Sequence, residues 1–197
     1  MRILLTFTAV ALIFAFSGTA ATVVPVGEFQ SVELSNGGHV TVRYGAVQRV
    51  SLVRGDLKYT TVRLGSGQRL IIDTHERGPE GYRTEVEVVT PHLSRASVAN
   101  GGILRTLGAF PAQDSIEAAV EQGGTVDIRS IPVDRVQASV DSGGRIFTTS
   151  RKSLTATVRS GGGITYWGNP TVSKSIRDGG VVTRGPAEDA DSGGSSE

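Results

Sequence analysis

One short phrase occurs six times in this chain and strongly limits what the chain can fold into. Each copy has an aliphatic residue, a spacer, a polar residue, two glycines, a second spacer and another aliphatic residue. The first glycines of the pairs are Gly37, Gly101, Gly123, Gly143, Gly161 and Gly179. The last five lie 22, 20, 18 and 18 residues apart, which is about one coil of a repeat protein. We therefore predict a tight turn, with a structural role, at each of these six glycines.

Apolar and polar residues alternate on both sides of the glycine pairs, which is the period of a half-buried β-strand. Ile116, Ala118 and Val120 precede one pair, and Val126 and Ile128 follow it. A unit of this size cannot bury its apolar face alone, but stacked copies bury a continuous core. We predict an all-β fold: a β-solenoid or β-helix-like stack of short strands with Gly-Gly turns and an N-terminal β cap. A sandwich also has short alternating strands but does not require the same registry at every turn.

The first residues, 1–21, have the pattern of a cleaved signal peptide. Arg2 precedes an apolar run from Ile3 to Phe16, and small residues follow that suit a signal peptidase. The alternative is a membrane anchor, but this run of 14 residues is shorter than the roughly 20 that a spanning helix needs. We therefore expect export to the periplasm or the cell surface, with no transmembrane segment in the mature chain.

The rest of the chain divides into three parts. Residues 22–92 carry one copy of the phrase and longer predicted strands, and we expect them to cap the stack. Residues 93–185 hold the other five copies and form one continuous domain with 22–92. The end, 186–197, is acidic and has no aliphatic residue larger than alanine, so we predict a disordered tail.

Composition excludes several classes of function. The chain has no cysteine, which rules out disulfides, thiolate metal sites, a cysteine nucleophile and a lipid-modified N-terminal cysteine. Without Arg2 the mature chain has 19 basic and 19 acidic residues, so it has no electrostatic footprint for nucleic acid. His39, His75 and His92 lie far apart without acidic partners at ligand spacing, and we expect neither a metal nor a cofactor.

Four residues are candidates for binding or chemistry. Glu121 and Asp141 precede the polar residue of successive turns, so their carboxyl groups should face outward on neighbouring strands about 4.8 Å apart. Retaining glycosidases use carboxyl pairs about 5 to 5.5 Å apart, which makes this pair the best lead toward an enzyme. Arg159 on the next coil should pair with Asp141, however, and an ordinary charged surface explains the same residues. If Ile164 is buried, alternation leaves Trp167 exposed, where it can stack on a sugar.

Several motifs follow one another between Val88 and Gly185: Val89–Leu93, the polar-Gly-Gly turns, and Gly162–Pro170 with its closing Gly-x-Pro. In these motifs the segment resembles a family of exported bacterial proteins called "putative auto-transporter adhesin, head GIN domain". Earlier strands around Phe29–Leu34 and Gly37–Val42 fit the opening of the family. It implies an all-β solenoid-like fold, a location in the bacterial cell envelope and no assigned enzymatic activity.

These observations favour a non-catalytic, exported binding or adhesin-like domain that presents a repetitive β surface at the cell envelope. Its expected partners are a polysaccharide, an envelope protein or further copies of the chain. Two alternatives stay open: a carbohydrate-active enzyme on a β-helix scaffold, which needs the Glu121–Asp141 pair, and a structural self-assembly module, which needs Trp167 in a subunit interface. Fold alone cannot choose among them.

Overall fold

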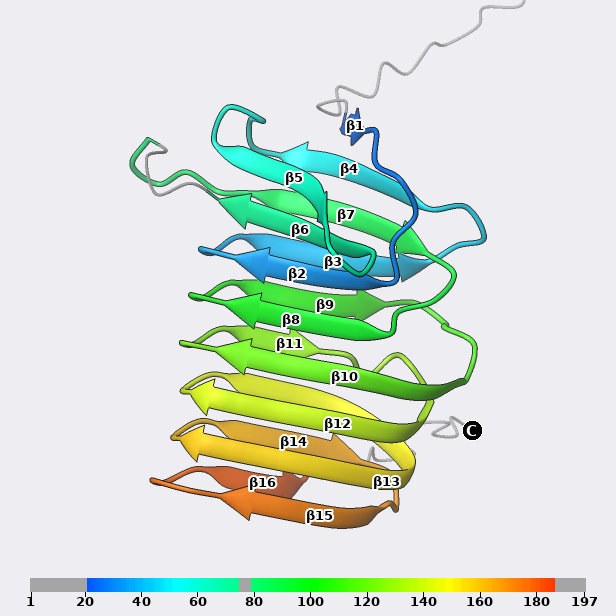
Figure 1. Cartoon of the computed structure of the whole chain (residues 1–197), viewed down its shortest axis with the longest axis vertical. Helices are drawn as coiled ribbons and strands as arrows, with labels where there is room; N and C mark the ends of the chain where they lie inside the picture. The colour runs from blue at the N-terminus through cyan, green and yellow to red at the C-terminus, as the bar shows by residue number, and fades with distance from the viewer. Residues whose placement is uncertain (1–20, 75–78, 187–197) are drawn as a thin grey trace, which may run out of the picture.

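A computed structural model describes residues 21–74 and 79–186, so most of the predicted signal peptide and disordered tail lie outside the described residues. Within those ranges there is no helix, and sixteen strands form one connected sheet (Figure 1). The predicted all-β class is confirmed. The strands are β1 (Thr22–Val24), β2 (Ser31–Ser35), β3 (His39–Tyr44), β4 (Arg49–Arg54), β5 (Thr60–Gly65), β6 (Arg69–Thr74), β7 (Glu85–Thr90), β8 (Arg95–Ala99), β9 (Ile103–Leu107), β10 (Gln113–Glu121), β11 (Thr125–Asp127), β12 (Val133–Ser142), β13 (Arg145–Ser160), β14 (Gly163–Trp167), β15 (Thr171–Ile176) and β16 (Val181–Arg184).

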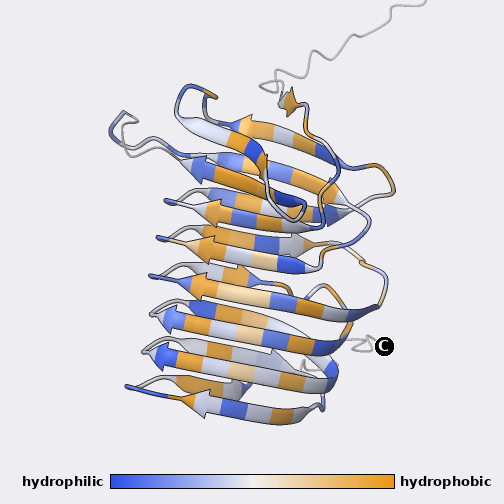
Figure 2. Ribbon diagram, in the orientation of Figure 1, coloured by the Kyte–Doolittle hydropathy of each residue, from blue (hydrophilic) through white to orange (hydrophobic). Residues whose placement is uncertain are grey.

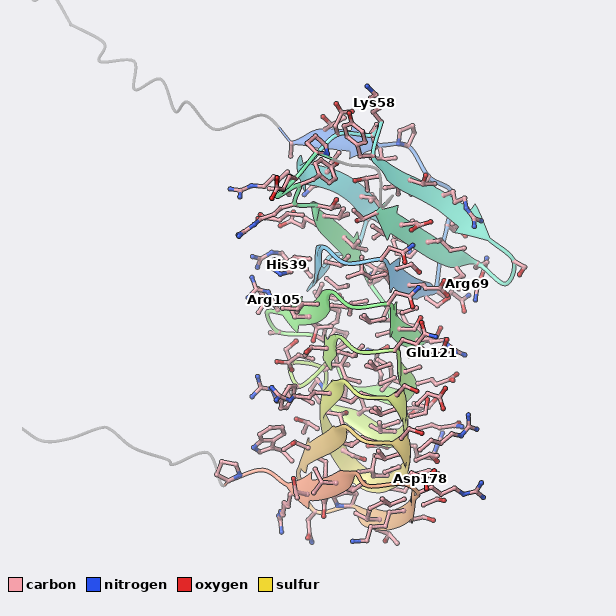
Figure 3. The ribbon with its side chains drawn as sticks, turned by 90° about the vertical axis from the view of Figure 1, so that its left-hand side faces the viewer. His39, Lys58, Arg69, Arg105, Glu121 and Asp178 are labelled. Atoms are coloured by element: carbon pink, nitrogen blue, oxygen red, sulfur yellow. The ribbon has the colours of Figure 1, made fainter. Side chains whose placement is uncertain are left out.

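The strands form two layers that face each other across the core. Layer 1 contains β3, β7, β9, β11, the first part of β13, β14 and β16, and layer 2 contains β2, β6, β8, β10, β12, the second part of β13 and β15. All pairs between these strands are parallel. Figure 3 shows the two outer faces, with His39 and Arg105 on layer 1 and Arg69 and Glu121 on layer 2.

We call a strand of layer 2, the turn after it and the following strand of layer 1 one coil. Equivalent residues of neighbouring coils lie directly above one another. Val120 pairs with Val98 on one side and with Val140 on the other, and Val158 continues the column. These side chains are at most 1% exposed. Because strand residues alternate in direction, the residues on either side of a buried aliphatic column point to the outer face, where some of them, such as Ser97 and Ala119, are also buried. The colours of Figure 2 show this alternation along many of the strands.

The two glycines of each pair have different physical roles. Both have positive φ in every turn, a region that costs an L-residue about 1–2 kcal/mol. A Cβ at the first glycine, such as Gly143, would meet open space. A Cβ at the second, Gly144, would lie 2.5 Å from a methyl group of Val120 and 2.9 Å from the carbonyl oxygen of Gly124. The second glycine therefore lets each turn rest on the turn before it.

A ladder of backbone hydrogen bonds joins these turns. The amide of Thr125 donates to the Gly102 oxygen at 2.9 Å, and the amide of Arg145 donates to the Gly124 oxygen at 2.9 Å. The same bond joins Gly163 to the Gly144 oxygen at 3.0 Å. The second glycine therefore contributes to stacking in two ways. Its missing side chain leaves room for the preceding turn, and its carbonyl oxygen accepts a hydrogen bond from the next turn.

The coils do not follow one another in sequence order. The coil of β2 and β3 lies between the coil of β6 and β7 and the coil of β8 and β9, with parallel pairing on both sides. Along the sequence, the chain runs first through the second coil of the stack (β2 and β3) and then through the outer coil (β6 and β7). It then returns to the other side of β2 as β8 (Figure 1). From β8 onward, stack order and sequence order agree.

The two ends of the stack differ. At the N-terminal end, β4 pairs antiparallel with β7, β1 pairs antiparallel with β4, and β5 pairs antiparallel with β6. These strands lie beyond the last parallel coil and cover it. At the other end, β15 pairs only with β13 and β16 only with β14 in the part of the chain that the structure describes.

One strand, β13, passes from layer 1 to layer 2 without a loop, and its corner is held by Asp134. The Asp134 carboxylate lies 2.7 Å from a guanidinium nitrogen of Arg151 and 2.5 Å from the Lys152 ammonium. The hydrogen bond from Lys152 lowers the pKa of Asp134, with Arg151 acting in the same direction and partial burial acting against both. The charged triad therefore holds β12 against the corner of β13.

Gly144→Ala should lower the free energy of unfolding more than Gly143→Ala. Both substitutions place a side chain at positive φ, at a cost of about 1–2 kcal/mol. Only Gly144→Ala also forces atoms of the preceding coil to move, which adds about 1–3 kcal/mol. Urea denaturation of the two variants measures the difference, and equal losses would contradict the close contact at the second glycine.

Asp134→Asn should destabilise the protein only where the wild-type carboxyl group is ionised. Because the native pKa is lowered, the stabilisation is fully present above the unfolded pKa of about 3.9. It is lost as the pH falls through the native pKa. The difference in unfolding free energy between wild type and variant should therefore shrink below about pH 4. Denaturation curves from pH 3 to pH 7 test this, and a pH-independent difference would contradict it.

Candidate functional site

Three side chains from successive coils meet on the outer face of layer 1. They are Arg129, which follows β11, Phe147 of β13 and Trp167 of β14, and we call them the aromatic cluster. In the same strands Ile164 is fully buried and Tyr166 packs against the core. Alternation along β14 therefore places Trp167 on the outside.

The cluster is organised around the Arg129 guanidinium. Its central carbon lies 5.4 Å from the centroid of the Phe147 ring and 5.0 Å from that of the Trp167 ring. Both distances are within the range of cation–π attraction. The two ring centroids are 6.3 Å apart with planes at 42°. One cation thus contacts two aromatic rings on neighbouring coils.

Asp127 fixes the orientation of Arg129. Arg129 Nε donates to Oδ1 of Asp127 at 2.9 Å and Nη2 donates to Oδ2 at 2.6 Å, which is a bidentate pair. The backbone amide of Arg129 also donates to Oδ1 at 3.2 Å. Asp127 faces outward opposite Phe147 in the register of β11 and β13. The carboxylate therefore orders the guanidinium before any ligand arrives.

Trp167 is half-buried, because its own chain covers part of the ring. The indole N–H donates to the Pro186 carbonyl oxygen at 3.0 Å. Gly185 packs directly against the indole, and a Cβ there would lie 2.2 Å from a ring carbon. The expectation of an exposed tryptophan thus holds for only part of the ring. The hydrogen bond to Pro186 fixes the orientation of the indole.

The other predicted residues lie at the turn edge of layer 2, away from Trp167. The register that pairs Val120 with Val140 places Glu121 and Asp141 on neighbouring strands. Arg159 Nη1 lies 3.3 Å from Oδ1 of Asp141, with side-chain exposures of 65% and 48%. Such exposed pairs contribute little to stability. The four predicted residues therefore do not form one site.

The sequence patterns did not identify Asp127, Arg129 or Phe147 as candidates. Arg129, Phe147 and Trp167 are 18 and 20 residues apart, which is the coil period. Aligning the copies beyond the glycine pairs would have placed these three residues in adjacent coils. The pairing of Arg129 with Asp127 gives no periodic signal, because both residues belong to one copy.

The described residues hold no group of three or more His, Asp or Glu side chains that could bind a metal ion. His39 lies on the outer face of layer 1 and His92 in the loop after β7, while His75 lies outside the described residues. Within the described ranges no helix has the length and apolar character needed to cross a membrane.

Residues 111–170 match the family model described as "Putative auto-transporter adhesin, head GIN domain". The resemblance inferred from the sequence is confirmed for this segment. The matched segment contains Asp127 and all three residues of the aromatic cluster. No curated protein matches the chain.

Solved structures of low sequence identity are similar to the chain. A "putative adhesin" from Bacteroides fragilis has 15% identity and a TM-score of 0.51, covering 84% of this chain and 95% of that one. A "putative adhesin" from Parabacteroides merdae has 11% identity and a TM-score of 0.40, covering 85% and 96%. A "putative cell adhesion protein" from Clostridium sporogenes has 7% identity and a TM-score of 0.37, covering 84% and 97%. The first of these shows a shared fold.

Proposed function

We propose that the chain is a non-catalytic, exported, adhesin-like domain that binds a glycan of the cell envelope through the outer face of layer 1. The observation that carries this proposal is the aromatic cluster, in which Arg129 is held between Phe147 and Trp167. The match of residues 111–170 to an adhesin family supports it, because that segment contains the cluster.

The chemistry of the cluster suits a saccharide. Binding sites for small ligands combine apolar and aromatic surface with a few well-placed polar groups. The exposed part of the Trp167 ring offers an apolar platform for the C–H face of a sugar. Bidentate pairing with Asp127 leaves the guanidinium of Arg129 oriented beside that platform. Little side-chain entropy remains to be lost on binding, which favours affinity.

The in-register stack also supports two finer assignments. We propose that the coils form a β-solenoid, since each unit pairs in parallel with its neighbours and buries one continuous core. We further propose that residues 22–92 and 93–185 are one continuous domain preceded by a signal peptide at 1–21. The pairing of β2 with β8 across that boundary supports a single domain.

The enzyme alternative has less support. Asp141 is paired with Arg159 in solvent, and Glu121 is exposed at the end of β10. A catalytic acid needs a raised pKa, which burial usually supplies. Glu121, Asp141 and Arg159 therefore form an ordinary charged surface at the turn edge of layer 2. For this reason we favour the binding role over the enzyme.

A glycan-array screen of the full chain tests the proposed function. We expect binding to a subset of glycans and a loss of at least about tenfold in affinity for Trp167→Ala, because stacking area disappears. The double variant Glu121→Gln with Asp141→Asn is the matched control and should bind like the wild type. Circular dichroism and thermal melting confirm that each variant is folded.

Two results would contradict the proposal. One is the absence of binding to any glycan. The other is binding that survives in folded Trp167→Ala but is lost in the double variant, which would assign the ligand to layer 2.

A further inference from the structure

The stack is open at its C-terminal end, where β15 and β16 have no neighbour on their outer sides in the described part of the chain. In Figure 1 these two strands form the bottom of the stack, opposite the covered end at β1, β4 and β5. Their backbone N–H and C=O groups therefore form an unpaired edge. Such an edge is a template for pairing with another strand.

Two columns that are apolar or neutral inside the stack end in basic residues at this edge. Lys174 continues the column of Ala118, Ala138 and Ala156, and Ala156 is fully buried. In the same way Arg184 follows Tyr166 in layer 1. Because register and pleat are kept, both basic side chains lie on the inward side of their strands.

Apolar residues flank these charges. Val172 and Ile176 lie two positions before and after Lys174, and Val182 lies two positions before Arg184. Val172 and Val182 pack partly against the core, while Ile176 is 40% exposed. The inward side of β15 therefore reads apolar, basic, apolar from Val172 to Ile176.

Neither basic side chain has an acidic partner among the described residues, since all ion pairs there are made by other residues. A strand that covered the edge with apolar side chains alone would bury Lys174 without compensation. Burying an unpaired ammonium group is strongly unfavourable. An occupant of this edge must therefore bring a carboxylate.

Two copies that meet through their open ends do not meet this requirement. If two open ends met about a twofold axis centred on β15, Lys174 would lie opposite Lys174 of the other copy. Arg184 would likewise lie opposite Arg184 of the other copy. Like charges directly opposite each other across strands are destabilising. Inward-pointing charges at an edge are a known means of preventing self-pairing.

We propose that the β15 edge binds an extended acidic segment of a partner protein by strand addition, a role that goes beyond glycan binding. In this mode, main-chain hydrogen bonds give affinity and alternate side chains give specificity. The partner segment has an apolar residue, any residue, Asp or Glu, any residue and a second apolar residue. Its carboxylate pairs with Lys174 and its apolar residues cover Val172 and Ile176. This pattern is the same in both chain directions.

The probe is the peptide Thr-Val-Thr-Glu-Thr-Val-Thr-amide with fluorescein on its N-terminal amine, titrated with the full chain and followed by fluorescence anisotropy. We expect saturable binding that is at least about tenfold weaker when the peptide carries Lys in place of Glu. Lys174→Glu should reverse this preference. Hydrogen exchange should show that the peptide protects the β15 amides.

Lys58→Glu is the matched control, because it makes the same change of charge at the covered end of the stack (Figure 3). It should leave peptide affinity unchanged. Light scattering at the assay concentration reports the oligomeric state of the free chain.

Four results would overturn the proposal. The first two are the absence of saturable binding and a peptide preference that Lys174→Glu does not change. The third is a dimer of the free chain that protects β15, which would assign the edge to a second copy. The fourth is strong protection of the β15 amides in the free monomer, which would assign the edge to a segment of the chain itself.

Discussion

The rest of the structure depends on the way each Gly-Gly turn lies on the turn before it. The second glycine has no side chain where the preceding coil comes within contact, and its carbonyl oxygen accepts a hydrogen bond from the next coil. This contact fixes the register of both layers at once. The buried columns, the alternation of the outer faces and the alignment of Arg129, Phe147 and Trp167 all follow from that register.

Sequence periodicity predicted this arrangement only in part. The spacing of the pairs and the aliphatic residues three positions away predicted the all-β class and the columns that contain Val120 and Val140. The difference between Gly143 and Gly144 could not be predicted, because it depends on contacts with another coil rather than on the turn itself. The place of β2 between β6 and β8 was also hidden, since no local pattern records the order in which coils stack.

The candidate site shows the same limit. Alternation placed Trp167 on the outer face, but the cover from Gly185 and Pro186 comes from the next coil, 18 residues or more along the chain. Asp127 and Arg129 belong to no sequence motif. Their part in the aromatic cluster is seen only from the contacts of Arg129 with Asp127, Phe147 and Trp167. A site that spans several coils is therefore found by aligning the sequence copies with one another. The distances between its side chains depend on how closely the coils pack.

Disulfide trapping tests the stacking order most directly, because the chain has no cysteine of its own. Ser35 pairs in register with Asp73 on one side and Ala99 on the other. This order predicts that Ser35→Cys with Ala99→Cys forms a disulfide on mild oxidation, since neighbouring strands lie about 4.8 Å apart. Asp73→Cys with Ala99→Cys, two strands apart at about 10 Å, should remain reduced. A disulfide in the second pair but not in the first would contradict this stacking order, because it would place the coils in sequence order.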